Sequence, residues 1–177
     1  MMMKRTEGFT LIELMVVLVV IGVGMSVAVP SFQGMIVRNR LITQTNEVIL
    51  AVNLARSEAS RTGSLVSIAA SDASSGNEFG GGFCVVLGLP ATCAGNVVRR
   101  FEAFAGTTTL NSVENVTLIQ FNSLGGLVSA GPQSHSLDLC RSGYRGRRIQ
   151  ISIIGRVKSH IEAAPGDLNP PTIQPSC

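Results

Sequence analysis

The sequence contains no tryptophan, one tyrosine and two histidines in 177 residues. Nucleic-acid bases stack on aromatic side chains, so Tyr144 is the only candidate for such a platform, and we expect it to pack against the tail instead. His135 and His160 are too far apart for metal-ligand spacing, and no Cys-x-x-Cys pair is present. The sequence therefore predicts neither a metal site nor another cofactor.

Catalytic motifs are also lacking. His135 and Asp138 lie near each other with serines nearby, but in a strand two side chains three residues apart face opposite sides. No nucleophile motif accompanies them, and no glycine-rich phosphate loop opens a helix. We therefore predict that the protein is not an enzyme.

Four cysteines are present, and this number suits an oxidising compartment. Four cysteines allow three disulfide connectivities. We favour Cys84 with Cys93, which closes a short loop containing glycine and proline, and Cys140 with Cys177, which ties down a proline-rich tail.

The N-terminus combines a basic leader with a long apolar run. Lys4 and Arg5 precede the run, and from Leu14 to Val29 no side chain is charged. Residues 11–29 would form a helix about 29 Å long, which is enough for one bilayer crossing. The basic leader places the N-terminus in the cytoplasm and the globular part on the other side of the membrane.

One acid, Glu13, stands near the start of this apolar run. An unpaired carboxylate in a membrane is costly, so this position indicates a partner. Residues 4–14 (Lys-Arg-Thr-Glu-Gly-Phe-Thr-Leu-Ile-Glu-Leu) resemble the class III signal of type IV pilins and type II secretion pseudopilins. The resemblance implies that a prepilin peptidase cuts between Gly8 and Phe9 and methylates Phe9. The new ammonium group could then pair with Glu13 of a neighbouring subunit.

An ordinary secretory signal is the alternative explanation of this segment. Ser26-Val27-Ala28 has the small-x-small pattern of a signal peptidase site, and the basic leader would be its n-region. We favour the pilin-like signal, because Glu13 does not suit the apolar core of a secretory signal and the apolar stretch passes into a helical pattern.

Beyond Pro30, which should end or kink the membrane helix, a second helical pattern begins. Six residues recur at alternating steps of four and three, as in an amphipathic helix packed on a domain, and Gly63 is a suitable C-cap. The two parts predict one N-terminal helix of about 50 residues from Phe9. Arg56 and Glu58 are expected at its solvated edge, paired locally. The stripe consists of Leu41, Thr45, Val48, Val52, Ala55 and Ala59.

After the helix, short strand patterns alternate with glycine, serine and asparagine turns. Ile149, Ile151 and Ile153 alternate with polar residues, so one sheet face should be buried and the other wet. Residues 71–82 are polar and glycine-rich and are expected to form a loop. The predicted strands are residues 65–70, 83–87, 97–104, 116–122, 136–141, 148–154 and 156–161.

Three further segments indicate which branch of the pilin-like proteins this chain resembles. Residues 54–59, 121–126 and 148–157 resemble, in order and spacing, the GspH/FimT branch of pseudopilins and minor pilins. The resemblance implies an α+β, type IV pilin-like fold, in which a long N-terminal helix packs on an antiparallel β-sandwich-like head. The predicted organisation is a removed leader at 1–8, a transmembrane helix at 9–30, an amphipathic helix at 31–62, a β-rich head at 63–162 and a proline-rich tail at 163–177.

Positive charge is concentrated near the C-terminus. Six of the 14 lysines and arginines fall in residues 141–158, which contain no acid, as expected of a polyanion site. In a strand, Arg156 and Lys158 would point to the same side about 6.6 Å apart, which suits neighbouring phosphates. Such contacts are independent of base sequence and sensitive to salt.

A motif of a similar protein family suggests which ligand these cations would bind. FimT-like minor pilins of naturally competent bacteria carry a Gly-Arg-x-Arg motif implicated in DNA binding, and Gly155, Arg156 and Lys158 resemble it. Lysine in the last place keeps the charge but lacks the bidentate fork of arginine. The resemblance implies a double-stranded DNA site here, and the alternative is a solvated edge strand whose cations discourage aggregation. Further cations would come from Arg145, Arg147 and Arg148.

The pattern as a whole is typical of a minor pilin of a type IV pilus. The family resemblance implies a single-pass bacterial inner-membrane protein with a cytoplasmic N-terminus and a periplasmic head, later assembled through its helix at or near the pilus tip, where it would prime biogenesis. The implied partners are the prepilin peptidase, other minor and major pilins and the inner-membrane assembly platform. Two alternatives are a GspH-like minor pseudopilin of a type II secretion system and a DNA receptor for natural transformation.

Overall fold

The structure is a computed structural model that describes residues 9–90, 92–128, 134–162, 175 and 177. It contains two compact units, Met1–Arg40 and Leu41–Cys177, and one helix contributes to both. The predicted leader and most of the predicted tail lie outside the described residues. Within the described part, no helix has an apolar stretch of the length needed to cross a membrane.

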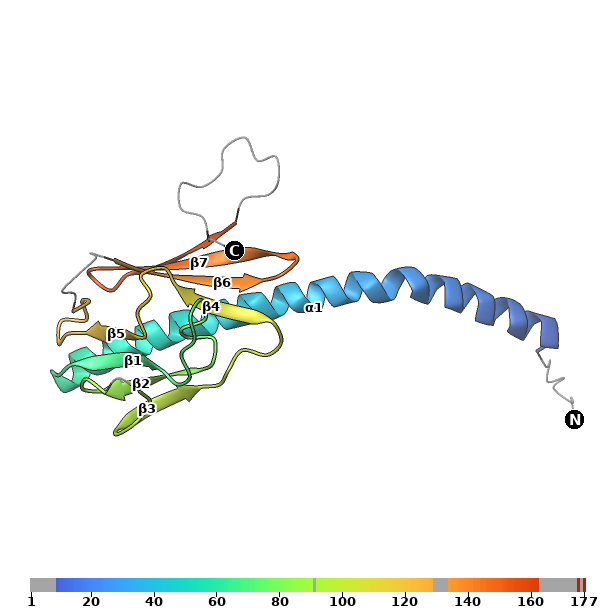
Figure 1. Cartoon of the computed structure of the whole chain (residues 1–177). Helices are drawn as coiled ribbons and strands as arrows, with labels where there is room; N and C mark the ends of the chain where they lie inside the picture. Colours follow the sequence, from blue (N-terminus) through green and yellow to red (C-terminus); the bar gives the residue numbers. More distant parts are fainter. Residues whose placement is uncertain (1–8, 91, 129–133, 163–174, 176) are drawn as a thin grey trace, which may run out of the picture. The chain divides into compact units, whose positions relative to one another are not determined.

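Helix α1 spans Leu11–Thr62 (Figure 1). Capping features are present at both of its ends. The hydroxyl oxygen of Thr10 accepts a hydrogen bond from the backbone N–H of Glu13 at 3.3 Å, as an N-cap does. Gly63 follows the helix with a φ of 64°, a left-handed conformation that suits glycine, so the predicted C-cap is confirmed. The helix continues through residue 30, which excludes a helix end there.

The C-terminal half of α1 buries the predicted stripe. Its six residues are at most 3% exposed, which confirms the amphipathic pattern. The hydroxyl of Thr45 is satisfied within the helix, because it donates to the carbonyl oxygen of Leu41 at 2.7 Å. Glu58 Oε2 lies 2.7 Å from Arg61 Nη2, so the local pairing predicted for Glu58 is confirmed.

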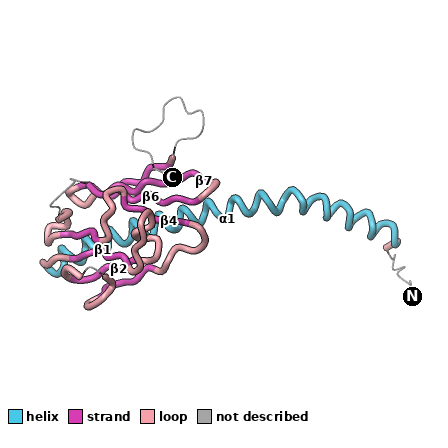
Figure 2. Tube along the Cα trace, viewed as in Figure 1, coloured by secondary structure: helices cyan, strands magenta, loops and turns pink. Residues whose placement is uncertain are grey.

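Two four-stranded antiparallel sheets form the rest of the second unit (Figure 1 and Figure 2). The first sheet has the strand order β3-β2-β1-β5, and the second has the order β4-β6-β7-β8. The predicted α+β class and antiparallel head are therefore confirmed. The strands are β1 Val66–Ala70, β2 Phe83–Leu87, β3 Val97–Phe101, β4 Thr108–Ser112, β5 Leu118–Phe121, β6 Ser134–Arg141, β7 Tyr144–Ser152 and β8 Val157–Ile161.

Strand β4 is absent from the sequence prediction. Its sequence, Thr-Thr-Leu-Asn-Ser, has Leu110 as its only apolar residue, so the alternation is too weak to indicate a strand. One edge of β4 pairs with β6, and the loop expected at residues 71–82 covers the other. Asn77 Oδ1 accepts a hydrogen bond from the N–H of Leu110 at 2.9 Å, and Glu78 Oε2 accepts one from the N–H of Ser112 at 2.9 Å. The loop thus protects an edge strand.

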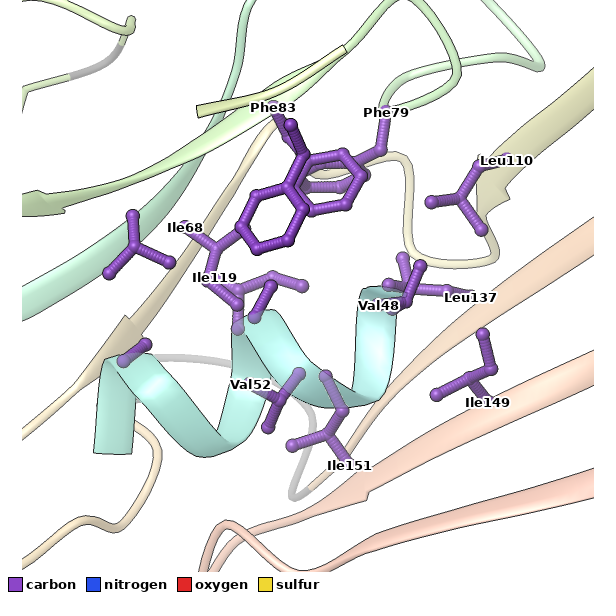
Figure 3. Close-up of a cluster of buried hydrophobic side chains, with 14 of the residues drawn as sticks. Val48, Val52, Ile68, Phe79, Phe83, Leu110, Ile119, Leu137, Ile149 and Ile151 are labelled. Atoms are coloured by element: carbon purple, nitrogen blue, oxygen red, sulfur yellow. The ribbon is translucent and has the colours of Figure 1, made fainter. Parts of the chain in front are cut away.

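The hydrophobic core lies between α1 and the inner faces of the two sheets (Figure 3). Ile149 and Ile151 are fully buried, which confirms the alternation predicted for β7. Ile153 is 49% exposed, because β7 ends at Ser152 and the chain turns, so the predicted strand end at residue 154 is wrong. The central side chains drawn in Figure 3 include Val48, Val52, Ile68, Phe79, Phe83, Leu110, Ile119 and Leu137.

Both expected disulfides are present. Cys84–Cys93 links β2 to the loop before β3, and Cys140–Cys177 links β6 to the last residue of the chain. Gly146 of β7 lies against the second disulfide, and a Cβ at this glycine would overlap with the sulfur of Cys177. The C-terminal residue is therefore packed on the second sheet.

Candidate functional site

The N-terminal part of α1 presents an exposed apolar surface with one acid. Every side chain described from residue 9 to residue 26 is exposed, including Phe9 at 84% and Glu13. Among the described residues, no cation of the chain lies within ion-pair distance of the Glu13 carboxylate. This surface can pack against apolar neighbours, and its one carboxylate can form an ion pair with a positive charge on a neighbour. The predicted cleavage residue Gly8 lies outside the described residues.

A second candidate site lies where β7 and β8 pair. Arg156 immediately precedes β8 and Lys158 is the second residue of the strand, and both are exposed. Lys158 pairs in register with Gln150. The two cations, with Gln150 and Ser152, line a hollow of about 100 Å³. Cations, hydroxyls and side-chain amides are the groups with which proteins contact phosphate.

Arg148 differs from these two cations because it has an acidic partner. Its Nε and Nη2 donate to Oδ1 and Oδ2 of Asp138, each at 2.6 Å. The Asp138 side chain is fully buried, and that of Arg148 is 14% exposed. The hydrogen bond to Asp138 raises the pKa of Arg148, against the opposing effect of burial. We therefore remove Arg148 from the candidate DNA contacts and interpret it as part of a structural pair between β6 and β7.

Arg145 and Arg147 lie apart from the hollow. Arg147 pairs in register with Ile161, three residues along β8 from Lys158, which is about 10 Å. Arg145 is exposed and donates from Nε and Nη2 to the backbone carbonyl oxygen of Glu162. Burial, followed by the nearby charge of Arg145, lowers the pKa of Arg147. The predicted cations are therefore spread over the sheet and do not form one cluster.

The two residues considered for catalysis are directed to different partners. His135 Nδ1 lies 3.8 Å from Glu114 Oε2, while Asp138 holds Arg148. The two side chains thus lie beside different charged residues. Tyr144, the candidate stacking residue, begins β7 and is partly buried against the core.

The turn between β7 and β8 determines where Arg156 lies. The N–H of Gly155 donates to the carbonyl oxygen of Ser152 at 2.7 Å, and the N–H of Arg156 donates to Ser152 Oγ at 3.1 Å. Gly155 is buried and has a φ of 74°, a conformation that residues with a Cβ adopt only with strain. Gly155 therefore shapes the turn through its backbone conformation. Because it is buried, we remove it from the DNA contacts with which the prediction had grouped it.

Gly155 also lies at the point where the three segments that carry the family resemblance meet. Arg56 Nε of α1 donates to the carbonyl oxygen of Gly125 at 3.0 Å, and a Cβ on Gly155 would overlap with both of these groups. Arg56 is only partly exposed and makes a contact 69 residues away in the chain. The prediction that Arg56 belongs to a solvated helix edge is therefore wrong, because its side chain packs on two turns.

The turn after β5 is held together by Asn122. Its Oδ1 accepts hydrogen bonds from the N–H groups of Leu124 and Gly126, both at 3.0 Å. The N–H of Leu127 donates to the carbonyl oxygen of Ile153 at 2.8 Å, which joins this turn to the β7–β8 turn. Residues 54–59, 121–126 and 148–157 thus form one structural junction beside the candidate phosphate site.

Two known protein-family patterns match this chain, one over its N-terminal segment and one over its head. Residues 44–155 match the family described as type II transport protein GspH, and residues 3–29 match the prokaryotic N-terminal methylation motif. The chain belongs to the GspH family. The GspH match covers Arg56, Gly125 and Gly155, and the methylation motif covers Gly8, Phe9 and Glu13.

Solved structures show the fold of this GspH-family chain. A crystal structure of the type IV minor pilin FimU from Pseudomonas aeruginosa matches with a TM-score of 0.59 and 24% identity, over 76% of this chain and 95% of that one. A second crystal structure of the same protein matches with a TM-score of 0.56 and 23% identity, over 73% and 96%. The pilin fold is thus shared with FimU.

Curated relatives match a shorter region. Two proteins of Dichelobacter nodosus, each described as a "probable minor fimbrial protein", are 45% identical over 53 residues. These residues are 28% of this chain and 33% of each relative, so the chain spans about a third of the length of the curated relatives it matches.

Sequence reasoning did not anticipate the support beneath Arg156. A charged residue on an amphipathic helix is normally solvated, so nothing local to Arg56 indicates its contact with Gly125. One feature of the sequence could have indicated that the two residues lie close together: Arg56 and Gly155 both belong to segments that resemble the same family.

Proposed function

We propose that this GspH-family chain is a minor pilin of a type IV pilus, cut between Gly8 and Phe9, methylated at Phe9 and assembled through α1. The methylation motif, the pilin fold and the exposed apolar surface of α1 support this function. The subunit acts by packing and performs no catalysis. Burial of its exposed helix against other subunits provides the driving force, at roughly 25 cal/mol per Å² of apolar surface.

The main support for this proposal is the position of Glu13. Its carboxylate stands on an apolar helix surface and, among the described residues, has no cation of its own chain as a partner. In a bilayer or a filament core such a charge is costly unless it is paired. Cleavage after Gly8 creates an ammonium group at Phe9, so the acid of one subunit and the amine of the next complete each other only on assembly.

Replacement of Glu13 by glutamine tests this proposal, because it removes the charge and retains the shape of the side chain. We expect membrane insertion and cleavage to persist while the amount of subunit in sheared pili falls. Glu47→Gln is the matched control, since Glu47 is an acid of the same helix outside the apolar run. Equal amounts of Glu13→Gln and wild-type subunit in sheared pili would contradict the pairing.

The proposed location follows from the same segment. Residues 9–30 would lie in the bacterial inner membrane as a single pass, with the N-terminus in the cytoplasm and the head in the periplasm, before the subunit moves to the pilus. Its proposed partners are the prepilin peptidase, the inner-membrane assembly platform and other minor and major pilins, with a priming role at or near the tip. The alternative is a minor pseudopilin of a type II secretion system. Deletion separates the two: loss of surface pili with normal protein secretion supports the pilin, and the reverse supports the pseudopilin.

A second candidate function is the binding of double-stranded DNA by Arg156 and Lys158, as in a receptor for natural transformation. The exposure of both cations and the hollow that they line together with Gln150 and Ser152 favour it. We expect the full chain in detergent micelles to retard duplex DNA weakly, without sequence preference, and with a strong dependence on salt. Arg156→Gln with Lys158→Gln should flatten the slope of log affinity against log salt by up to about 1.8, at roughly 0.9 per phosphate contact.

The matched control for this experiment is Arg38→Gln with Arg40→Gln. Both of these residues are exposed on α1, and the double variant makes the same change in net charge. An equal effect of the two double variants would show only a response to net charge. Absence of retardation at low salt would leave Arg156 and Lys158 as solvated edge-strand cations.

A further inference from the structure

Arg56 stands beneath the turn that presents Arg156, although it lies on α1 and is separated from that turn by about 100 residues of chain. Its Nε donates to the carbonyl oxygen of Gly125, and the backbone of Gly155 lies directly against Nε and Cδ of the same side chain. The stem of Arg56 is therefore enclosed between two turns. The aliphatic stem of an arginine commonly packs on the protein surface in this way, and Arg56 is accordingly only partly exposed.

The β7–β8 turn has its own internal hydrogen bonds, but these alone do not determine how it lies against the helix. Ser152 accepts from the N–H groups of Gly155 and Arg156, which closes the turn on itself. Contacts with the rest of the fold come from the Leu127 N–H to Ile153 and from the packing of Gly155 on Arg56. Arg156 is the residue that follows Gly155, and Lys158 is two residues further on.

We propose that Arg56 is a positioning residue for the phosphate site: by holding Gly125 and supporting Gly155, it fixes the turn so that Arg156 and Lys158 face the same ligand. The proposal rests on the second candidate function, DNA binding at these two cations. A defined separation between them allows both to contact one phosphate backbone, whereas a loosened turn loses the paired contact. The guanidinium of Arg56 itself contacts no DNA, because its side chain is used within the fold.

Two substitutions separate the hydrogen bond from the charge. In Arg56→Gln, Nε2 stands the same number of bonds from Cα as the arginine Nε, so the donor to Gly125 is kept and the charge is removed. In Arg56→Met, the stem has the same length and carries no donor. Arg56→Lys is a further variant that keeps the charge and moves the donor beyond the Gly125 oxygen, and it serves if the methionine variant does not accumulate.

Hydrogen exchange on the full chain in detergent micelles tests the positioning without DNA. With Arg56→Met we expect amides of residues 152–156 to exchange about fivefold faster, the factor that one hydrogen bond of ordinary net strength represents. Amides of β6 should exchange at the wild-type rate. Arg56→Gln should leave both regions unchanged. Unaltered exchange at residues 152–156 in Arg56→Met would overturn the proposal, whatever the chain does with DNA.

Retardation of a DNA duplex by the same variants tests the consequence. Arg56→Met should flatten the salt slope by up to about 1.8, as the loss of two phosphate contacts does, and Arg56→Gln should bind like wild type. In the background of Arg156→Gln and Lys158→Gln, Arg56→Met should have no further effect, since its contribution acts through those two residues. An equal loss of binding in Arg56→Gln and Arg56→Met would show that the Arg56 charge contacts DNA and would overturn the proposal. Wild-type chain that does not retard DNA refutes the candidate function, while the exchange result still decides whether Arg56 holds the turn.

Discussion

Replacement of Gly155 by alanine measures how closely the β7–β8 turn approaches α1. Gly155 has a φ of 74°, where an alanine costs roughly 1–2 kcal/mol relative to a right-handed conformation. Its Cβ would also overlap with Arg56 and with the Gly125 carbonyl oxygen, and overpacking of this kind typically costs about 1–3 kcal/mol. We therefore expect the free energy of unfolding to fall by roughly 2–5 kcal/mol. For a chain of this size that lowers Tm by about 2–4 °C for each kcal/mol.

Gly143 supplies a matched control within the same sheet. It has a φ of 80° in the turn between β6 and β7, and a Cβ there would meet no atom within 4 Å. Gly143→Ala should therefore incur only the backbone cost, so the difference between the two variants isolates the close approach at about 1–3 kcal/mol. Thermal unfolding followed by far-ultraviolet circular dichroism suits a chain without tryptophan. Equal destabilisation by the two alanines would refute the argument that Gly155 is packed against Arg56.

Three further predictions concern the buried ion pair, the disulfides and maturation. Asp138→Asn should lower the free energy of unfolding by roughly 3 kcal/mol in a chemical denaturation, because it removes one partner of a buried pair; a loss as small as that of a surface substitution would contradict the structural role of Arg148. The raised pKa of Arg148 makes its contribution to stability present below its usual pKa and lost only as the pH rises through a still higher value, so the titration of Arg148 should give no pH dependence near neutrality. Cys140→Ser with Cys177→Ser should lower stability by about 4 kcal/mol and Cys84→Ser with Cys93→Ser by about 3 kcal/mol, since the first disulfide closes the longer loop; the opposite order in thermal melts would contradict the loop-closure argument. Gly8→Val should block maturation, because a side chain crowds the cleavage site, and mass spectrometry of the wild-type subunit should find methylated Phe9 at its N-terminus, whereas an N-terminus at Val29 would establish an ordinary secretory signal.

Local features of the sequence were sufficient for the helix and for most of the strands. The apolar stripe of α1 repeats with the helical period, and Gly63 ends it with a residue suited to the left-handed conformation, so both could be inferred without knowledge of the rest of the chain. The alternation of Ile149 and Ile151 with polar residues likewise predicted which face of β7 is buried. The number of cysteines indicated a disulfide-bonded chain, and the pairing that their loops favoured is present in the fold.

Features that depend on distant neighbours could not be inferred in this way. Strand β4 is polar, and it is a strand because β6 pairs with one edge while Asn77 and Glu78 satisfy the other. Arg148 has the same sequence context as the other cations of the basic segment. Only the pairing of β7 with β6 places it beside buried Asp138 and withdraws it from solvent.

The candidate phosphate site shows the same division. The sequence by itself indicated that Arg156 and Lys158 would lie on the same side of the chain, as alternate residues of an extended segment do. Both line the hollow, although Arg156 lies in the turn and β8 begins one residue later than predicted, at Val157. The tertiary structure decided that Arg145 and Arg147 do not join them: the register along β8 pairs Arg147 with Ile161, and Arg145 donates to the carbonyl oxygen of Glu162. It also decided that Arg56 lies against the turn and that Gly155, within the turn, is buried. Periodicity and capping act over a few residues and are visible in the sequence, whereas the close packing of α1 on two turns exists only once the chain has brought residues 56, 125 and 155 together.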